Sequence, residues 1–186
     1  ENKYYNFKGL NLSIETIDGL VKHNGRVLNQ DKFNRILGKK FFKNKINYLK
    51  SPSLEAQLAA ISDDIAYNSH DLEDGLRAKL YTIEDLKNIP VLSRIINKHK
   101  KFIKLKGSEL VLRQIIRSII NEMVNDIILN TKNNIKKQKI DSIKDIYNSK
   151  ILLVSFSKQM KLFDKSIKSF LRDKMYYNKD VLKKTN

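Results

Sequence analysis

The chain has 186 residues and no cysteine, which excludes disulfides, thiolate zinc sites and cysteine nucleophiles. Its hydrophobic content of 41% is ordinary for a globular protein, and no apolar run reaches the roughly 18 residues that cross a bilayer. The net charge of +17 suits a polyanionic partner, but Lys, Asn and Ile are enriched together, so a generic solvated surface and a specific basic patch both stay open. We expect a single cytoplasmic helical unit over residues 1–186.

The first elements in chain order are predicted to be helices. Apolar residues recur mostly at helical spacing and only two prolines and six glycines interrupt the chain, which indicates an all-α fold. Ser13 can cap a helix over residues 14–23, which the pair Asn24-Gly25 ends. Ser51-Pro52 resembles an N-cap followed by proline at the first helical position, opening a helix over residues 52–79 in which Gly75 is the weak point.

The later elements are also predicted to be helical. Thr82 and Asp85 indicate a short capped helix, and further helices are expected over residues 90–101, 108–135 and 156–176. The helix over residues 108–135 has the strongest apolar pattern, which predicts that Ile116, Ile119, Ile120 and Met123 are buried. Residues 131–150 are polar and lysine-rich, as expected of a surface excursion. The sequence "ILLVSF" (residues 151–156) is compatible with a short strand or with a buried extended turn.

The long helix around residue 63 has two distinct faces. At 100° per residue, the side opposite Asp63 carries apolar side chains, so we expect Leu58, Ile61, Ile65 and Leu72 to be buried. Tyr67, His70, Asp71 and Asp74 fall within about 80° of Asp63 and form one polar stripe.

The stripe has two interpretations. It is compatible with the wet face of an amphipathic helix. However, residues 51–76 contain no Lys or Arg in a chain of net charge +17, and Ala59, Ala60 and Ala66 flank the acids. A lysine-free carboxylate stripe beside small residues favours a cation site that another element or a ligand can approach closely.

The stretch "SLEAQLAAISDDIAYNSHDLEDGLRA" resembles the segment that carries the last metal-binding aspartate of HD-domain deoxyguanosinetriphosphate triphosphohydrolases. The resemblance extends to "FKGLNLSIETIDGLVKHNG", "RQIIRSIINEMVNDII" and "FLRDKMYYNKDV" and so covers most of the chain. It implies the C-terminal portion of an HD-domain helical bundle and a metal-dependent hydrolase acting on dGTP or another dNTP, in a family that often forms oligomers.

The resemblance also implies roles for single residues. Asp63 matches the metal ligand, and Tyr67 and Asp71, one and two turns later, match residues that hold the sugar and phosphate end of the nucleotide. Asp64 is a competing ligand, but only Asp63 is in register with Tyr67 and Asp71.

The three histidines are weaker candidates. His70 is interpreted as a residue of the polar stripe that supports the site without holding the metal. His23 is either a ligand contact or a cation at a helix C-terminus. His99 lies among lysines and is expected at the surface.

The family's other metal ligands, a His and a His-Asp pair upstream of the aspartate, do not occur in this chain, and the chain opens with Glu1 rather than Met. We therefore expect either a split or decayed gene or one piece of a longer polypeptide. The chain alone is expected to be inactive. Bound to its complementary half and to a divalent ion such as Mg or Mn, it is expected to convert dGTP to deoxyguanosine and tripolyphosphate. The alternative is a non-catalytic helical remnant that binds nucleotides or nucleic acid through its lysines.

Overall fold

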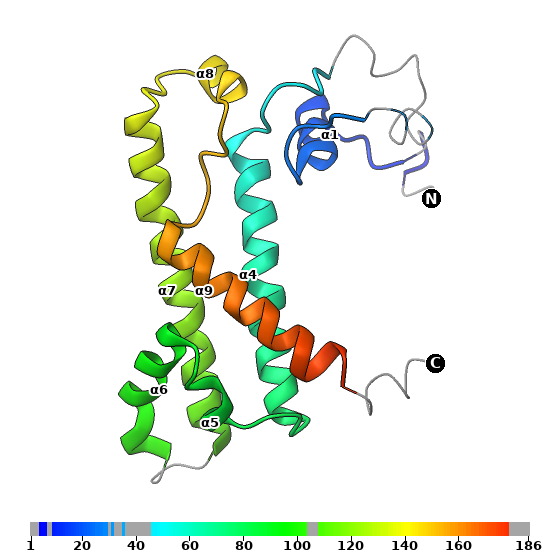
Figure 1. Ribbon diagram of the computed structural model, residues 1–186. Helices are drawn as coiled ribbons and strands as arrows, with labels where there is room; N and C mark the ends of the chain where they lie inside the picture. The colour runs from blue at the N-terminus through cyan, green and yellow to red at the C-terminus, as the bar shows by residue number, and fades with distance from the viewer. Residues whose placement is uncertain are drawn as a thin grey trace. The chain divides into compact units, whose positions relative to one another are not determined.

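All regular elements in the described part of the chain are helices, as the sequence predicts. The computed structural model describes residues 4–6, 9–29, 31, 35, 46–103 and 108–178, and it contains no strand there (Figure 1). The elements are α1 (Ile14–Lys22), α4 (Leu54–Arg77), α5 (Ile83–Leu86), α6 (Pro90–Ile103), α7 (Ser108–Lys137), α8 (Ile143–Asn148), α9 (Lys158–Leu171) and the π-helical turn η1 (Arg172–Tyr176). None of these helices combines the length and the apolarity that spanning a membrane requires. The chain ends, residues 1–3 and 179–186, on which the expectation of a truncated chain partly rests, lie outside the described residues.

Local capping signals decide where several helices begin and end. The Ser13 hydroxyl accepts a hydrogen bond from the Thr16 amide at 3.2 Å, which caps α1 as predicted. The turn after α1 contains Gly25 at φ +101°, a conformation that favours glycine. Thr82 and Asp85 form a reciprocal capping box at the start of α5.

The predicted start of α4 was wrong by two residues. The helix begins at Leu54, and the Ala56 amide donates to the Ser53 hydroxyl at 3.2 Å, so Ser53 rather than Ser51 is the capping residue. Pro52 lies before the helix, and its carbonyl accepts from the Gln57 side-chain amide at 2.9 Å. Two serines flank the proline, and the sequence alone favoured the first because proline is common at the first helical position.

The chain divides into two compact units. The first consists of Glu1–Ile61 and Asn133–Ser155, and the second of Ser62–Lys132 and Phe156–Asn186. The expectation of a single helical unit stays a prediction.

In the first unit, residues of α1, of the turn after it and of the segment before α4 contact the α8 region. The Arg26 guanidinium donates to the Ser149 carbonyl, and the Ser51 amide donates to the Tyr147 carbonyl at 2.9 Å. Lys22 is almost completely buried, pairs with Asp18 at 2.6 Å and lies 5.6 Å from the centre of the Tyr147 ring. These contacts fix the C-terminal end of the surface excursion that was predicted over residues 131–150.

Residues 151–156 form no strand but an irregular segment with bends, and only its later part is buried as the second alternative for "ILLVSF" expects. Leu153 and Val154 are buried, whereas Ile151 and Leu152 are exposed. The Val154 amide donates to the Gln57 side-chain oxygen at 3.0 Å, and the Asn134 side-chain amide donates to the Leu153 carbonyl at 2.9 Å. Side chains of α4 and α7 therefore satisfy the backbone of this segment.

The prediction that Leu58 is buried was wrong, because half of its surface is exposed. The first turns of α4 bury Ala56 and Gln57 instead. Ala56 lies against Gly19 of α1, and Gln57 bonds to the Pro52 carbonyl and the Val154 amide. The residues that α4 buries in its first turns therefore lie on a different side of the helix from Ile65 and Leu72, which it buries further along.

The second unit contains the expected core. Ile65 and Leu72 of α4 are buried there as predicted, whereas Ile61, which belongs to the first unit, is partly buried. On α7, Ile116, Ile119 and Met123 are buried as predicted, but Ile120 is only partly so. The apolar face of α9 completes this core with Met160, Phe163, Ile167 and Leu171.

Candidate functional site

The outer side of α4 presents the stripe that the sequence predicts. Asp63 and His70 are exposed, Tyr67 has 60% of its surface accessible, and Asp71 is partly buried. The four belong to one continuous helix, whose 3.6-residue period brings them to one side while Ile65 and Leu72 enter the core.

Asp71 and Tyr67 meet a residue from the far end of the chain. The Tyr176 hydroxyl, in η1, donates a hydrogen bond to the Asp71 carboxylate. The pKa of Tyr176 lies far above its ordinary value. Burial raises it most, followed by the hydrogen bond to Asp71, the negative charge of Asp71 and the nearby Tyr67. Tyr176 therefore stays a neutral donor, and two phenols and one carboxylate form a cluster with hydrogen-bonding capacity and aromatic surface.

Tyr81 fixes the backbone beneath this cluster. Its hydroxyl lies 3.2 Å from the carbonyl oxygens of both Asp71 and Leu72, to which it donates. Its ring packs edge-on against Phe170 of α9, with centroids 4.8 Å apart. Burial, followed by the charges of Asp71 and Asp74, raises the pKa of Tyr81 well above the usual phenol value.

A polar network joins α4 to α9 next to this cluster. The Asn68 side-chain amide, in a buried residue, donates to Asp164 at 2.9 Å, and Lys168 pairs with Asp164 at 3.0 Å and with Asp64 at 3.5 Å. Burial alone would lower the pKa of Lys168, but its bonds to Asp164 and Asp64 raise it above the ordinary value. Figure 1 shows α9, in orange, crossing α4 along this contact.

The two neighbouring aspartates therefore differ in their environments. Asp64 faces Lys168, whereas the Asp63 carboxylate has no hydrogen-bond or ion-pair partner within the described residues. A carboxylate without a partner keeps its full capacity to accept a cation, while the charge of Asp64 is already compensated. The assignment of Asp63 as the metal ligand stays a prediction.

The histidines behave differently from one another. His23 sits at the C-terminal end of α1, where Nδ1 donates to the Leu20 carbonyl at 2.7 Å and Nε2 accepts from the Asn24 amide at 2.8 Å. Both ring nitrogens are thus used in local hydrogen bonds at the end of the helix. His70 is exposed on the stripe. His99 was expected at the surface but is partly buried, with Nε2 3.1 Å from the Ser118 hydroxyl.

The described residues alone do not fit a divalent ion. They contain no group of three or more His, Asp or Glu side chains that could hold a metal. Mg²⁺ is usually bound by one or two carboxylates together with waters and substrate phosphates, so Asp63 can supply one ligand of such a set but not the set itself.

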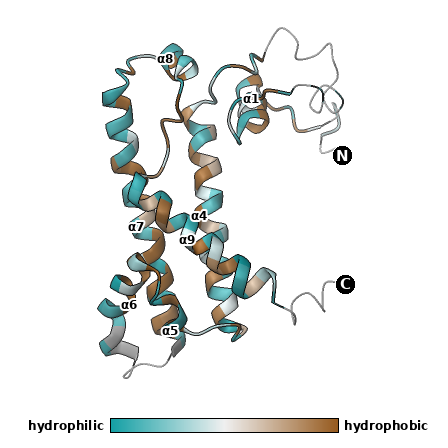
Figure 2. Cartoon of the chain, viewed as in Figure 1, coloured by the Kyte–Doolittle hydropathy of each residue, from teal (hydrophilic) through white to brown (hydrophobic). Residues whose placement is uncertain are grey.

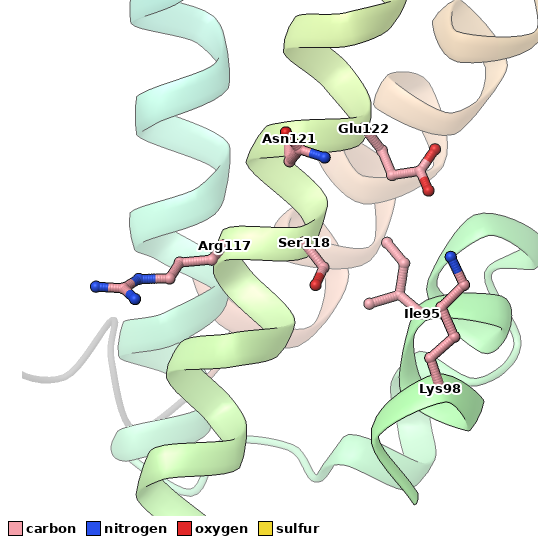
Figure 3. Close-up of a pocket in the computed structure, with 6 residues that line it drawn as sticks. All are labelled: Ile95, Lys98, Arg117, Ser118, Asn121 and Glu122. Carbon is pink, nitrogen blue, oxygen red and sulfur yellow. The ribbon is translucent and has the colours of Figure 1, made fainter.

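A separate cavity of about 290 Å³ lies between α6 and α7, away from the stripe (Figure 3). Its lining residues are Ile95, Lys98, Arg117, Ser118, Asn121 and Glu122. Glu122 pairs with Arg94 at 2.9 Å. None of Asp63, Tyr67 and Asp71 lines it.

Sequence reasoning assigned no role to Tyr176, Lys168 or Asp164. These residues lie about 100 positions after α4, so helical periodicity around Asp63 cannot connect them to the stripe. A usable signal existed for Tyr176, which lies within "FLRDKMYYNKDV", one of the stretches that carry the family resemblance. The lysines of α9 gave no comparable signal because lysine is abundant throughout the chain.

Comparison with known proteins finds relatives that match nearly the whole of this chain. The chain is 51% identical over 186 residues to a deoxyguanosinetriphosphate triphosphohydrolase-like protein of Pelagibacter ubique. It is 37% identical over 195 residues to the protein of that name from Bartonella tribocorum, and 33% identical over 187 residues to that from Neorickettsia sennetsu. The matches cover 98 to 100% of this chain but 47 to 50% of the relatives, so the chain spans about half their length. No family model matches the chain.

Proposed function

Because this chain is homologous along its whole length to deoxyguanosinetriphosphate triphosphohydrolase-like proteins, we propose that it is one part of a metal-dependent dNTP triphosphohydrolase. The proposed reaction converts dGTP to deoxyguanosine and tripolyphosphate in an HD-domain type of helical bundle. The observation that carries the proposal for this chain is the meeting of Tyr67, Asp71 and Tyr176 on the same side of α4 as Asp63, whose carboxylate has no partner among the described residues.

Each residue of the stripe has a proposed task. Asp63 supplies one carboxylate to a ligand set for a divalent ion such as Mg or Mn, which the other part of the enzyme completes. Tyr67 packs against the deoxyribose, and Asp71 accepts the proton of a sugar hydroxyl. Asp64, His70 and His23 do not bind the ion. The hydrogen bond from Tyr176 orients the Asp71 carboxylate, and the pair of Lys168 with Asp64 and Asp164 fixes α9 against α4.

The chain alone is proposed to be inactive. A single carboxylate cannot position both an ion and the water that attacks the phosphorus, so an excess of divalent metal should not rescue it. The proposed partner is the complementary half of the enzyme, with the assembled protein a cytoplasmic oligomer that binds dGTP or another dNTP.

The test is an assay of tripolyphosphate release from dGTP and the other dNTPs, with and without the complementary half. Release should appear only with both parts. In the assembled enzyme Asp63→Ala should abolish release, whereas the neighbouring variant Asp64→Ala should leave a measurable fraction because Asp64 already faces Lys168. Strong release by the isolated chain, or equal loss in both variants, would contradict the assignment.

A second candidate function rests on α9. Its residues Lys158, Lys161, Lys165 and Lys168 are all exposed in a chain of net charge +17, which favours non-catalytic binding of nucleic acid or nucleotides. Such binding would weaken steeply with salt and would need no complementary half. Titration of a fluorescent oligonucleotide at several salt concentrations, using the isolated chain, separates this candidate from the hydrolase.

A further inference from the structure

Helix α7 carries exposed apolar residues in addition to its buried apolar side. Ile115, Ile119, Met123 and Ile127 are buried on one side, yet Val124 and Ile128 have 40% and 45% of their surfaces exposed. In Figure 2 the middle turns of α7 are largely brown, the colour of apolar residues. Gln114, Ser118 and Asn125 make another side of the helix polar, so Val124 and Ile128 are apolar residues that lie outside the buried side.

The exposed apolar residues form a continuous stripe with polar neighbours. Val124 and Ile128 are four residues apart and therefore adjacent on the helix surface. Arg117 and Asn121, which are exposed and also line the cavity between α6 and α7, continue the same side toward the start of α7. In Figure 3 Arg117 extends from α7 on the side away from α6. We call these four residues the α7 outer face. Apolar residues bordered by arginine and an amide resemble the centre and rim of a protein interface.

The distribution of lysine supports this interpretation. No lysine occurs between residues 109 and 131, although lysine is abundant elsewhere in the chain. The solvated side of α9, in contrast, carries Lys158, Lys161 and Lys165, all exposed. Lysine is depleted from protein interfaces because its ammonium group is strongly hydrated. Helix α7 thus lacks the residue type that this chain places on its solvated surface.

The relatives indicate what covers this face. They are about twice as long as the matched segment, so each carries as much polypeptide again outside it. We propose that the α7 outer face docks the half of the enzyme that corresponds to this remaining polypeptide. The choice of partner rests on the proposed function, whereas the position of the docking face rests on the exposure and composition of α7.

Binding can be tested without catalysis. The half of the Pelagibacter ubique relative that lies outside the matched segment is purified and titrated with the 186-residue chain by calorimetry, in the absence of metal and nucleotide. The unmodified chain should bind. The double variant Val124→Glu/Ile128→Glu should bind at least about tenfold more weakly, because the complex would bury two unpaired carboxylates.

The matched control is Leu162→Glu. Leu162 is 62% exposed on α9, among the exposed lysines, so the same change of charge there should leave the affinity unchanged. Circular dichroism melts check that the double variant is folded. As a second measurement, a photo-crosslinking residue at position 128 should capture the complementary half, and the same residue at position 162 should not.

The outcomes separate the two proposals. Three outcomes would overturn the docking proposal. The unmodified chain does not bind, the double variant and Leu162→Glu weaken binding equally, or position 128 crosslinks only to a second copy of this chain. Binding through the α7 outer face without tripolyphosphate release would refute the hydrolase and retain the docking face. Release by the mixture with no effect of the glutamates would refute the docking face and retain the hydrolase.

Discussion

The ring of Tyr81 lies directly over Gly75, so that a β-carbon at position 75 would collide with the phenol. Gly75 is a helix interior residue that should weaken α4, since glycine costs roughly 0.5–1 kcal/mol relative to alanine there. The close approach of Tyr81 explains why glycine occurs at this position and how the phenol reaches the carbonyls of Asp71 and Leu72.

This contact predicts a change of sign between two backgrounds. Gly75→Ala should destabilise the natural chain because the methyl group meets the ring. In the Tyr81→Ala background the same change should be neutral or stabilising by up to about 1 kcal/mol, since only helix propensity remains. Urea denaturation of the two single variants and the double variant measures the coupling. The absence of coupling would show that Tyr81 does not occupy this position.

The buried phenol of Tyr81 predicts weaker folding in alkali. Its pKa is raised in the folded chain, so its contribution to stability is complete below the unfolded phenol value of about 10 and is lost as pH rises from there toward the folded value. Urea midpoints measured between pH 8 and 11 should fall less steeply for Tyr81→Phe than for the natural chain. Identical slopes would mean that the ionisation of Tyr81 does not oppose folding.

The two leucines of α4 should differ strongly in their contributions. Leu72 is fully buried, and Leu72→Ala should cost about 2–5 kcal/mol of unfolding free energy. Leu58 is half exposed, and Leu58→Ala should change stability by about 0.5 kcal/mol or less. Denaturant melts of the two variants provide each other's control, and similar losses would restore the original sequence prediction for Leu58.

The network between α4 and α9 should depend on Asp164 more than on Asp64. Asp164→Ala removes the partner of the buried Asn68 amide and should cost about 1–3 kcal/mol. Asp64→Ala removes an exposed pair at 3.5 Å and should cost about 0–1 kcal/mol, decreasing in high salt. Thermal unfolding at two salt concentrations measures both changes, and a larger loss for Asp64→Ala would contradict this ranking.

The helices could be predicted where the information is local. Ser13, Thr82 and Asp85 cap helices through residues within one turn, and the period of the apolar residues in α7 identifies Ile119 and Met123 as core. Leu58 could not be placed in this way because its exposure depends on Gly19 and Val154, which lie on other segments and bury Ala56 and Gln57 instead. Which side of a helix is buried depends on the segments that pack against it, and these can change along the length of the helix.

The candidate site shows the same division. The common side of Asp63, Tyr67 and Asp71 follows from one helical period. The contacts that distinguish Asp63 from Asp64 and that hold Asp71 come from Lys168 and Tyr176, because α9 folds back over α4. Such contacts between distant segments are set by tertiary packing, and no spacing within α4 encodes them.

The lack of basic residues between positions 51 and 76 also has a practical consequence. Trypsin cleaves after lysine and arginine, so digestion releases α4 with its flanking residues as one peptide from Ser51 to Arg77. This peptide contains Asp63, Tyr67 and Asp71 together. Carboxyl labelling or hydroxyl-radical footprinting followed by mass spectrometry therefore reports the solvent accessibility of the whole stripe from a single fragment, before and after a nucleotide or a second polypeptide is added.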